Sequence, residues 1–146
     1  MSSMEPMELR HGYAGNVSFT EPLPGIGSYT GFQLAPVEGT DDLFSMTVEG
    51  APPGTTPRLF LLDPAQYFLD YAPSIPRDVA VELADADGEE DAINLAVLVV
   101  VHPGDDNTGP TANLLAPIVL SPDTRRARQV VLEGAPWPLR APLVAA

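Results

Sequence analysis

The run from Thr111 to Leu120, Thr-Ala-Asn-Leu-Leu-Ala-Pro-Ile-Val-Leu, constrains the fold of this 146-residue chain more than any other stretch. Pro117 excludes a regular helix through its middle, because proline lacks a backbone N–H and its ring clashes with the preceding turn. The three residues that follow Pro117 are apolar, and two of them are β-branched, which is typical of a buried strand. The run therefore predicts a further strand or a pair of strands.

Asn113 lies between apolar neighbours in this run, and we expect its side chain to lie inside the protein. A buried amide has to find hydrogen-bond partners. Two interpretations stay open: the amide ties two segments of the chain together, or it contacts a binding partner directly.

Short stretches with alternating or continuous apolar residues recur along the chain at intervals of roughly 8–15 residues. Besides the run at 111–120, they predict strands at 16–20, 29–34, 43–48, 58–62, 78–83, 93–101 and 128–132. The stretch 93–101 is almost continuously apolar, which favours a central position. Asp63 and Pro64 predict a helix start, with Asp as the N-cap, and a helix of about two turns over residues 64–71.

About eight or nine short strands with a single short helix are typical of an all-β, mainly antiparallel barrel or sandwich. We expect residues 1–12 to form a flexible N-terminus, because they carry no hydrophobic period. Residues 133–146 are expected to form an extended tail. Trp137, between two prolines, is expected to pack this tail against the domain.

The charge of the chain restricts its partners. There are 20 carboxylates against 7 cations, which gives a net charge of −13. Such a surface repels phosphate backbones, so direct nucleic-acid binding is not expected, whereas a basic protein partner would be attracted. The alternative is that the acidity serves only solubility. The chain has no cysteine, no visible signal peptide and no apolar run long enough to span a membrane, so we expect a cytoplasmic protein without membrane contact.

The acidic residues are densest between Glu82 and Asp91. Six carboxylates occur there without a cation among them. Asp85-x-Asp87-Gly88 begins like a calcium-binding loop, but a third ligand is missing and the glycine comes two positions early. No metal ion or other cofactor is therefore expected. The segment is interpreted either as a solvated face or as a docking site for a basic partner.

Catalytic motifs are missing from the sequence. His11 and His102 are far apart and fall in expected loops, and no nucleophile elbow, phosphate-binding loop or His-Glu-x-x-His pattern occurs. The residues by themselves therefore indicate a small acidic binding module without catalytic residues. An enzyme is not expected.

At residues 111–120 the sequence resembles the flagellar assembly factor FliW family. Gln129-Val130-Val131-Leu132 follows this run at the family's spacing, and Leu23-Pro24-Gly25 resembles the family's N-terminal turn. The resemblance covers about residues 13–143 and implies a single FliW-like β-barrel domain. The motif residues that we expect to be structural are Leu23, Pro24, Gly25, Thr111, Ala112, Leu114, Ala116, Pro117 and Gln129.

The resemblance implies a cytoplasmic protein with two protein partners. FliW-like proteins bind the small RNA-binding translational repressor CsrA and thereby lift its repression of flagellin mRNA. They also bind newly made flagellin, whose secretion frees FliW to act on CsrA. A flagellin chaperone that does not bind CsrA is the competing interpretation. We expect a monomer, with partner contacts from Asp85, Asp87, Glu89, Glu90, Asp91 and Asn113.

Overall fold

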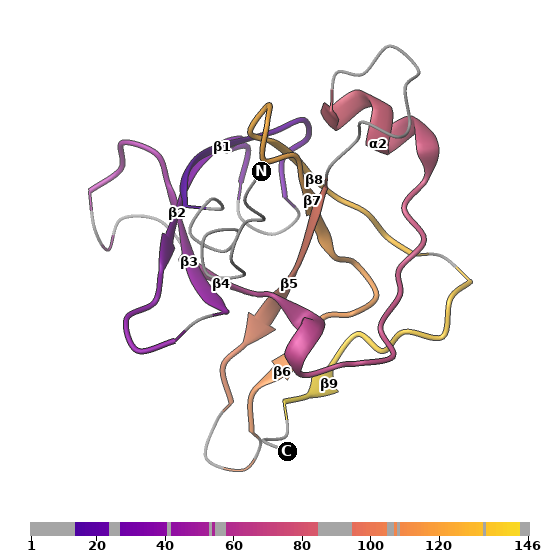
Figure 1. Cartoon of the computed structure of the whole chain (residues 1–146). Coiled ribbons are helices and arrows are strands. Elements are labelled where there is room, and N and C mark those ends of the chain that lie inside the picture. The colour runs from indigo at the N-terminus through magenta and orange to yellow at the C-terminus, as the bar shows by residue number, and fades with distance from the viewer. Residues whose placement is uncertain are drawn as a thin grey trace, which may run out of the picture.

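The fold is a barrel of short strands, seen in a computed structural model of the chain (Figure 1). The structure describes residues 14–23, 27–40, 42–52, 54, 58–84, 95–104, 107, 109–132 and 134–143. Within these ranges the strands are β1 (Gly15–Phe19), β2 (Gly31–Pro36), β3 (Leu43–Val48), β4 (Leu59–Leu62), β5 (Ala96–His102), β6 (Thr111–Ala112), β7 (Ile118–Leu120), β8 (Arg126–Gln129) and β9 (Ala141–Pro142).

Seven of these strands close into the barrel. Their order is β4-β3-β2-β1-β8-β7-β5, and β5 pairs with β4 to complete the ring. β6 and β9 continue the sheet from the end of β5, at the bottom of the view in Figure 1. Among the described strands every pairing is antiparallel except that of β1 with β8. The prediction of a mainly antiparallel all-β domain is confirmed, and of the two architectures it is the barrel.

The barrel interior is filled by the apolar residues that alternate along the strands. In β3, for example, Phe44, Met46 and Val48 point inward and are buried, while the residues between them are partly exposed. The rings of Phe19 and Phe32 meet edge to face inside, with centroids 5.4 Å apart. This period of two follows from the pleat of a strand, and it is the reason why the sequence pattern located these strands correctly.

β5 is apolar on both faces because both faces are covered. Leu98 belongs to the cluster inside the barrel, and its neighbour Val99 belongs to a second cluster outside, with Leu62 and Leu114. β5 also pairs with three strands, β4, β6 and β7. The central position predicted from its continuous apolarity is confirmed.

The strand predicted at residues 78–83 is wrong, because Arg77–Ala84 form the α-helix α2. Val79, Val81 and Leu83 alternate, but Val79 and Leu83 also stand one helical turn apart. These two are the residues that α2 buries against the outer faces of β7 and its surroundings. Asp78 in the first turn favours the helix through its dipole. In Figure 1, α2 lies near the top of the view, at the opposite end from β6 and β9.

The helix predicted at residues 64–71 is only a 3-10 turn, η1 (Pro64–Gln66). Its start is confirmed: Asp63 is the N-cap, and its Oδ1 accepts a hydrogen bond from the N–H of Ala65 at 3.1 Å. The chain leaves the helical path after Tyr67, and Phe68 and Tyr71 then turn inward to pack on the cluster outside β5. Tertiary packing therefore ends this helix before its second turn.

The C-terminal tail is held along the barrel by side chains and backbone together. Trp137 contacts Tyr71 edge to face with ring centroids 4.8 Å apart, and it packs on both clusters outside the barrel. The backbone of Leu114 donates to the carbonyl of Pro138, and β9 pairs with β6. The role predicted for Trp137 is confirmed.

Arg125 fixes the parallel contact that closes the barrel. It stands in the turn between β7 and β8 with a positive φ of 62°, which a non-glycine residue rarely adopts. Its guanidinium donates to the carbonyls of Ala14 and Asn16 at 3.1 and 3.0 Å, and its own carbonyl accepts from the N–H of Ser18. Burial lowers the pKa of this guanidinium without neutralising it. One residue thus ties the start of β1 to the start of β8.

We predict that Arg125→Ala destabilises the protein by roughly 2 kcal/mol, because it removes charged hydrogen bonds from the closing contact. Arg125→Gly removes the same bonds but relieves the left-handed backbone, so it should be more stable than Arg125→Ala by roughly 1 kcal/mol. Urea unfolding of the three proteins measures both differences. An alanine variant as stable as the parent would show that the guanidinium does not hold the barrel closed.

Tyr71 provides a second test, at alkaline pH. Its hydroxyl donates to the carbonyl of Leu114 at 2.7 Å, and burial raises the pKa of Tyr71 to about 12 from its ordinary value of 10.0. The neutral phenol therefore stabilises the fold fully below pH 10, and this contribution is lost as the pH rises towards about 12. Tyr71→Phe should lower the free energy of unfolding by about 1 kcal/mol at neutral pH.

The difference between the parent and Tyr71→Phe should shrink between pH 10 and about 12, as measured by thermal unfolding across this range. Tyr29→Phe is the matched control, because the Tyr29 side chain is 43% exposed. A Tyr71→Phe deficit that stays constant up to pH 12 would contradict the assigned hydrogen bond.

Candidate protein-binding surface

The run at residues 111–120 forms β6, a tight turn and β7. In the turn, Oδ1 of Asn113 accepts hydrogen bonds from the N–H groups of Leu115 and Ala116, at 3.1 and 3.0 Å. Both bonds stay within the turn that joins β6 to β7, so they hold the turn itself. The short asparagine side chain replaces backbone partners that the interrupted ladder cannot supply. A direct contact of Asn113 with a partner stays a prediction.

β8 continues past its last paired residue along this turn. Gln129 donates from Nε2 to the carbonyl of Ala116 at 3.1 Å, and the N–H groups of Val130 and Leu132 donate to the carbonyls of Pro117 and Leu115. The reciprocal bond at Pro117 cannot form, because proline has no N–H. This is why the regular strand ends at Gln129, three residues before the predicted end at 132. Residues 130–132, the β8 extension, are held from one side.

A cavity of about 380 Å³ opens beside the turn, at one end of the barrel. We call it the mouth cavity. Its wall comes from several strand ends and the turn, and includes Leu23, Leu59, Val100, Asn113, Gln129 and Val131. Asn113 and Gln129 therefore shape this cavity through the hydrogen bonds that hold the turn.

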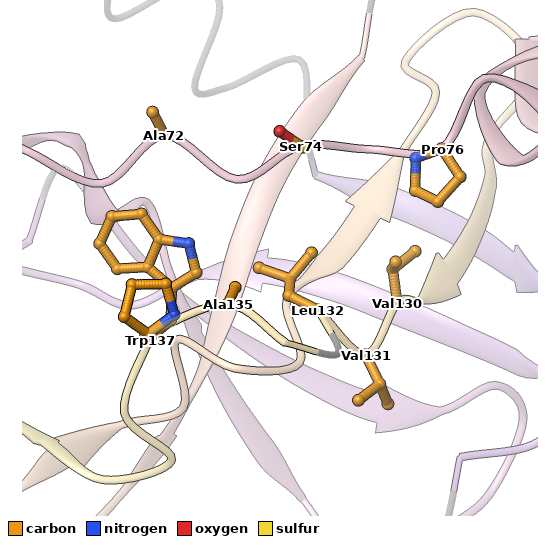
Figure 2. Close-up of a pocket in the computed structure, with 9 residues that line it drawn as sticks. Ala72, Ser74, Pro76, Val130, Val131, Leu132, Ala135 and Trp137 are labelled. Atoms are coloured by element: carbon orange, nitrogen blue, oxygen red, sulfur yellow. The ribbon is translucent and has the colours of Figure 1, made fainter.

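A second cavity, of about 470 Å³, lies outside the barrel between residues 72–76, the β8 extension and residues 135–137. We call it the outer groove (Figure 2). Val130 and Leu132 point from its floor towards the segment that carries Ser74 and Pro76, whereas Val131 points the other way. Val131 belongs to the walls of both cavities, and its side chain is 59% exposed.

Three side chains from the β7–β8 hairpin bond the C-terminal end of α2, where the acidic residues begin with Glu82. The Thr124 hydroxyl donates to the carbonyl of Leu83 at 2.5 Å, and Arg126 donates to the carbonyl of Glu82 at 3.2 Å. Arg128 pairs with the Glu82 carboxylate at 3.2 Å and lies 3.6 Å from that of Glu21. These groups satisfy the last carbonyls of the helix and place positive charge at its C-terminus.

The other predicted site residues are placed as follows. Asp85, Asp87, Glu89, Glu90 and Asp91 lie outside the described residues, as do Pro24 and Gly25 of the N-terminal motif and the flexible segment predicted at 1–12. Leu23, Ala112, Leu114, Ala116 and Pro117 are buried, and Thr111 pairs in β6. His102 is exposed at the end of β5, and His11 is not described.

The sequence pattern did not reveal Val131 as a surface residue, because an apolar residue inside a strand-like run is predicted to be buried. The only available signal is Pro117, whose missing N–H weakens the ladder opposite Val130. Where the structure describes the chain, His, Asp and Glu side chains do not gather into groups of three that could ligate a metal ion. Nor does any of its helices have the length and apolarity needed to cross a bilayer.

Comparison with known proteins gives a consistent family. The family model described as FliW protein matches residues 4–143. The chain belongs to the FliW family. It is 32% identical over 136 residues to the flagellar assembly factor FliW of Geobacillus sp. (strain WCH70), which covers 86% of this chain and 88% of that protein. It is 30% identical over 125 residues to the protein of the same name from Symbiobacterium thermophilum, covering 86% of each.

A solved structure agrees with this FliW assignment. The crystal structure of the flagellar assembly factor FliW superposes with a TM-score of 0.71 at 25% identity, over 90% of this chain and 86% of that one. The barrel and its short helix are therefore the FliW fold. The resemblance first noticed at residues 111–120 is confirmed over nearly the whole chain.

We predict that the two hydrogen bonds accepted by Asn113 Oδ1 determine which residues are tolerated at position 113 of the FliW barrel. Asn113→Ala leaves the N–H groups of Leu115 and Ala116 unpaired and should destabilise the protein by about 1–2 kcal/mol. Asn113→Asp keeps an acceptor oxygen and should stay within about 0.5 kcal/mol of the parent. Chemical denaturation of both variants tests this. Equal losses in the two variants would mean that the acceptor is not what the turn requires.

Proposed function

We propose that this chain is a cytoplasmic flagellar assembly factor that binds the translational repressor CsrA and flagellin, and so couples flagellin synthesis to assembly. The observation that carries the proposal is its membership of the FliW family over residues 4–143, with relatives named as flagellar assembly factors. In this scheme flagellin occupies the protein until it is secreted. The freed protein then binds CsrA and lifts repression of flagellin mRNA.

The charge of the chain supports the CsrA arm of this proposal. An RNA-binding repressor has to present cations to phosphates, and a protein with net charge −13 attracts such a surface. Glu82 and Glu21 are partly exposed beside the cations of β8, and the acidic segment follows directly after α2 in the sequence. We assign CsrA contacts to the segment from Asp85 to Asp91.

A flagellin chaperone without CsrA binding is the competing function. Co-purification with CsrA and with flagellin from the same organism, each freed of RNA, separates the two. A stoichiometric complex with each protein supports the proposed function. Capture of flagellin alone favours the chaperone, and capture of neither refutes both.

We predict that reversing Asp87, Glu89 and Glu90 together to Lys weakens CsrA binding by about tenfold or more, because the attraction is electrostatic. The loss should be larger at low ionic strength, since salt screens charges beyond about 10 Å at 0.1 M. Isothermal titration calorimetry at two salt concentrations measures both effects.

The matched control reverses Glu38, Glu49 and Asp70, which are exposed and lie elsewhere in the sequence. Each triple variant changes the net charge from −13 to −7, because three reversals add two charges each. The control should lose less than about threefold in affinity. Equal losses in both variants would show that net charge, rather than this segment, attracts CsrA.

A further inference from the structure

The β8 extension carries an open backbone edge at Val131. The N–H groups of Val130 and Leu132 both point to the turn, where they donate to Pro117 and Leu115. Backbone groups alternate in direction along an extended chain, so the N–H and C=O of Val131 point to the opposite side. There they make no hydrogen bond with the described residues.

The edge is open because β1 leaves it. β1 is the neighbour of β8 on this side, and their parallel pairing covers Ser18 with Arg126 and Phe19 with Ala127. The last bond of this contact is from the N–H of Thr20 to the carbonyl of Ala127. Beyond it the described part of the chain from 20 to 23 makes no backbone bond to the β8 extension.

The surroundings of this edge suit an extended peptide. An added strand sends alternate side chains to opposite faces. Here the two faces hold the mouth cavity and the outer groove, and both have walls made mostly of apolar residues. Val131 lines both cavities, and its side chain is exposed. An N–H and a C=O that have no partner among the described residues, with an apolar cavity on each face, suit the addition of a strand.

We propose that Val131 is the docking edge for an extended segment of a partner protein, which adds as a strand beside the β8 extension. The segment carries apolar side chains at alternate positions, one for each cavity. The inference rests on the proposed function, since it assigns a binding edge to one of the two proteins named there.

Charge favours a basic docked segment over an acidic one. At the β1 end of the edge, the Glu21 carboxylate is exposed beside Arg128 at 3.6 Å, with 64% of the side chain accessible. Across the chain, carboxylates outnumber cations 20 to 7. A partner segment with Lys or Arg next to its apolar residues therefore complements this edge, and an acidic segment is repelled.

The first measurement is hydrogen exchange of the full chain alone and with purified CsrA or flagellin from the same organism. The Val131 amide should exchange rapidly in the free protein and become protected with one of the two partners. Val131→Pro removes the N–H that a docked strand needs, at no cost in hydrogen bonds among the described residues, and should weaken that partner about tenfold. Val131→Thr keeps the N–H and a β-branched side chain, and should bind within about threefold of the parent.

Each outcome decides the inference, even where Val131→Pro fails to fold, because the exchange measurement uses the unaltered protein. Partner binding that leaves the Val131 amide unprotected would overturn the docking edge and leave the proposed function standing. If the Val131 amide instead becomes protected in the free protein as it forms a concentration-dependent dimer, the edge serves self-association. That result would also overturn the proposed docking of a partner. Binding of neither partner would refute the proposed function together with the edge.

Discussion

The parallel contact between β1 and β8 is the constraint on which the rest of this barrel depends. The closed ring has seven strands, and strand direction cannot alternate all the way around a ring with an odd number of strands. One pair is therefore parallel, and that pair is short. Parallel pairing is weaker per residue than antiparallel pairing, so the contact needs support from outside the ladder. Arg125 supplies it by adopting a left-handed backbone conformation and donating to the carbonyls of Ala14 and Asn16 at the start of β1. The shortness of this contact also leaves the β8 extension without a strand partner on the β1 side among the described residues.

The β7–β8 hairpin organises both candidate surfaces of the molecule. Its turn residue Thr124 and its strand residues Arg126 and Arg128 hold the end of α2, from which the acidic segment starts. Its extension beyond Gln129 forms the wall between the mouth cavity and the outer groove. A shift of this hairpin would therefore move the end of α2 and the wall between the two cavities together.

The sequence predicted those features that depend on local patterns. The inward residues of β3 alternate with polar ones, and Asp63 with Pro64 marks a helix start, so both were located correctly. α2 was misassigned because Val79 and Leu83 satisfy a period of two as well as one helical turn, and only packing on the barrel decides between them. The roles of Asn113 and the exposure of Val131 follow from which carbonyls Pro117 and the turn leave available, and sequence alone does not contain that geometry.

The acidic segment and the Val131 edge would contribute differently to partner binding. Charge acts over about 10 Å at 0.1 M salt, so acidic groups mainly raise the rate at which a basic partner arrives. Backbone pairing and burial in two apolar cavities act only on contact, so they mainly slow dissociation and select an extended segment of matching pattern. Salt would then change the association rate of such a complex far more than its dissociation rate. In the proposed complex, an acidic FliW barrel with an open edge would thus distinguish a basic partner that has a suitable strand from the many basic proteins that have none.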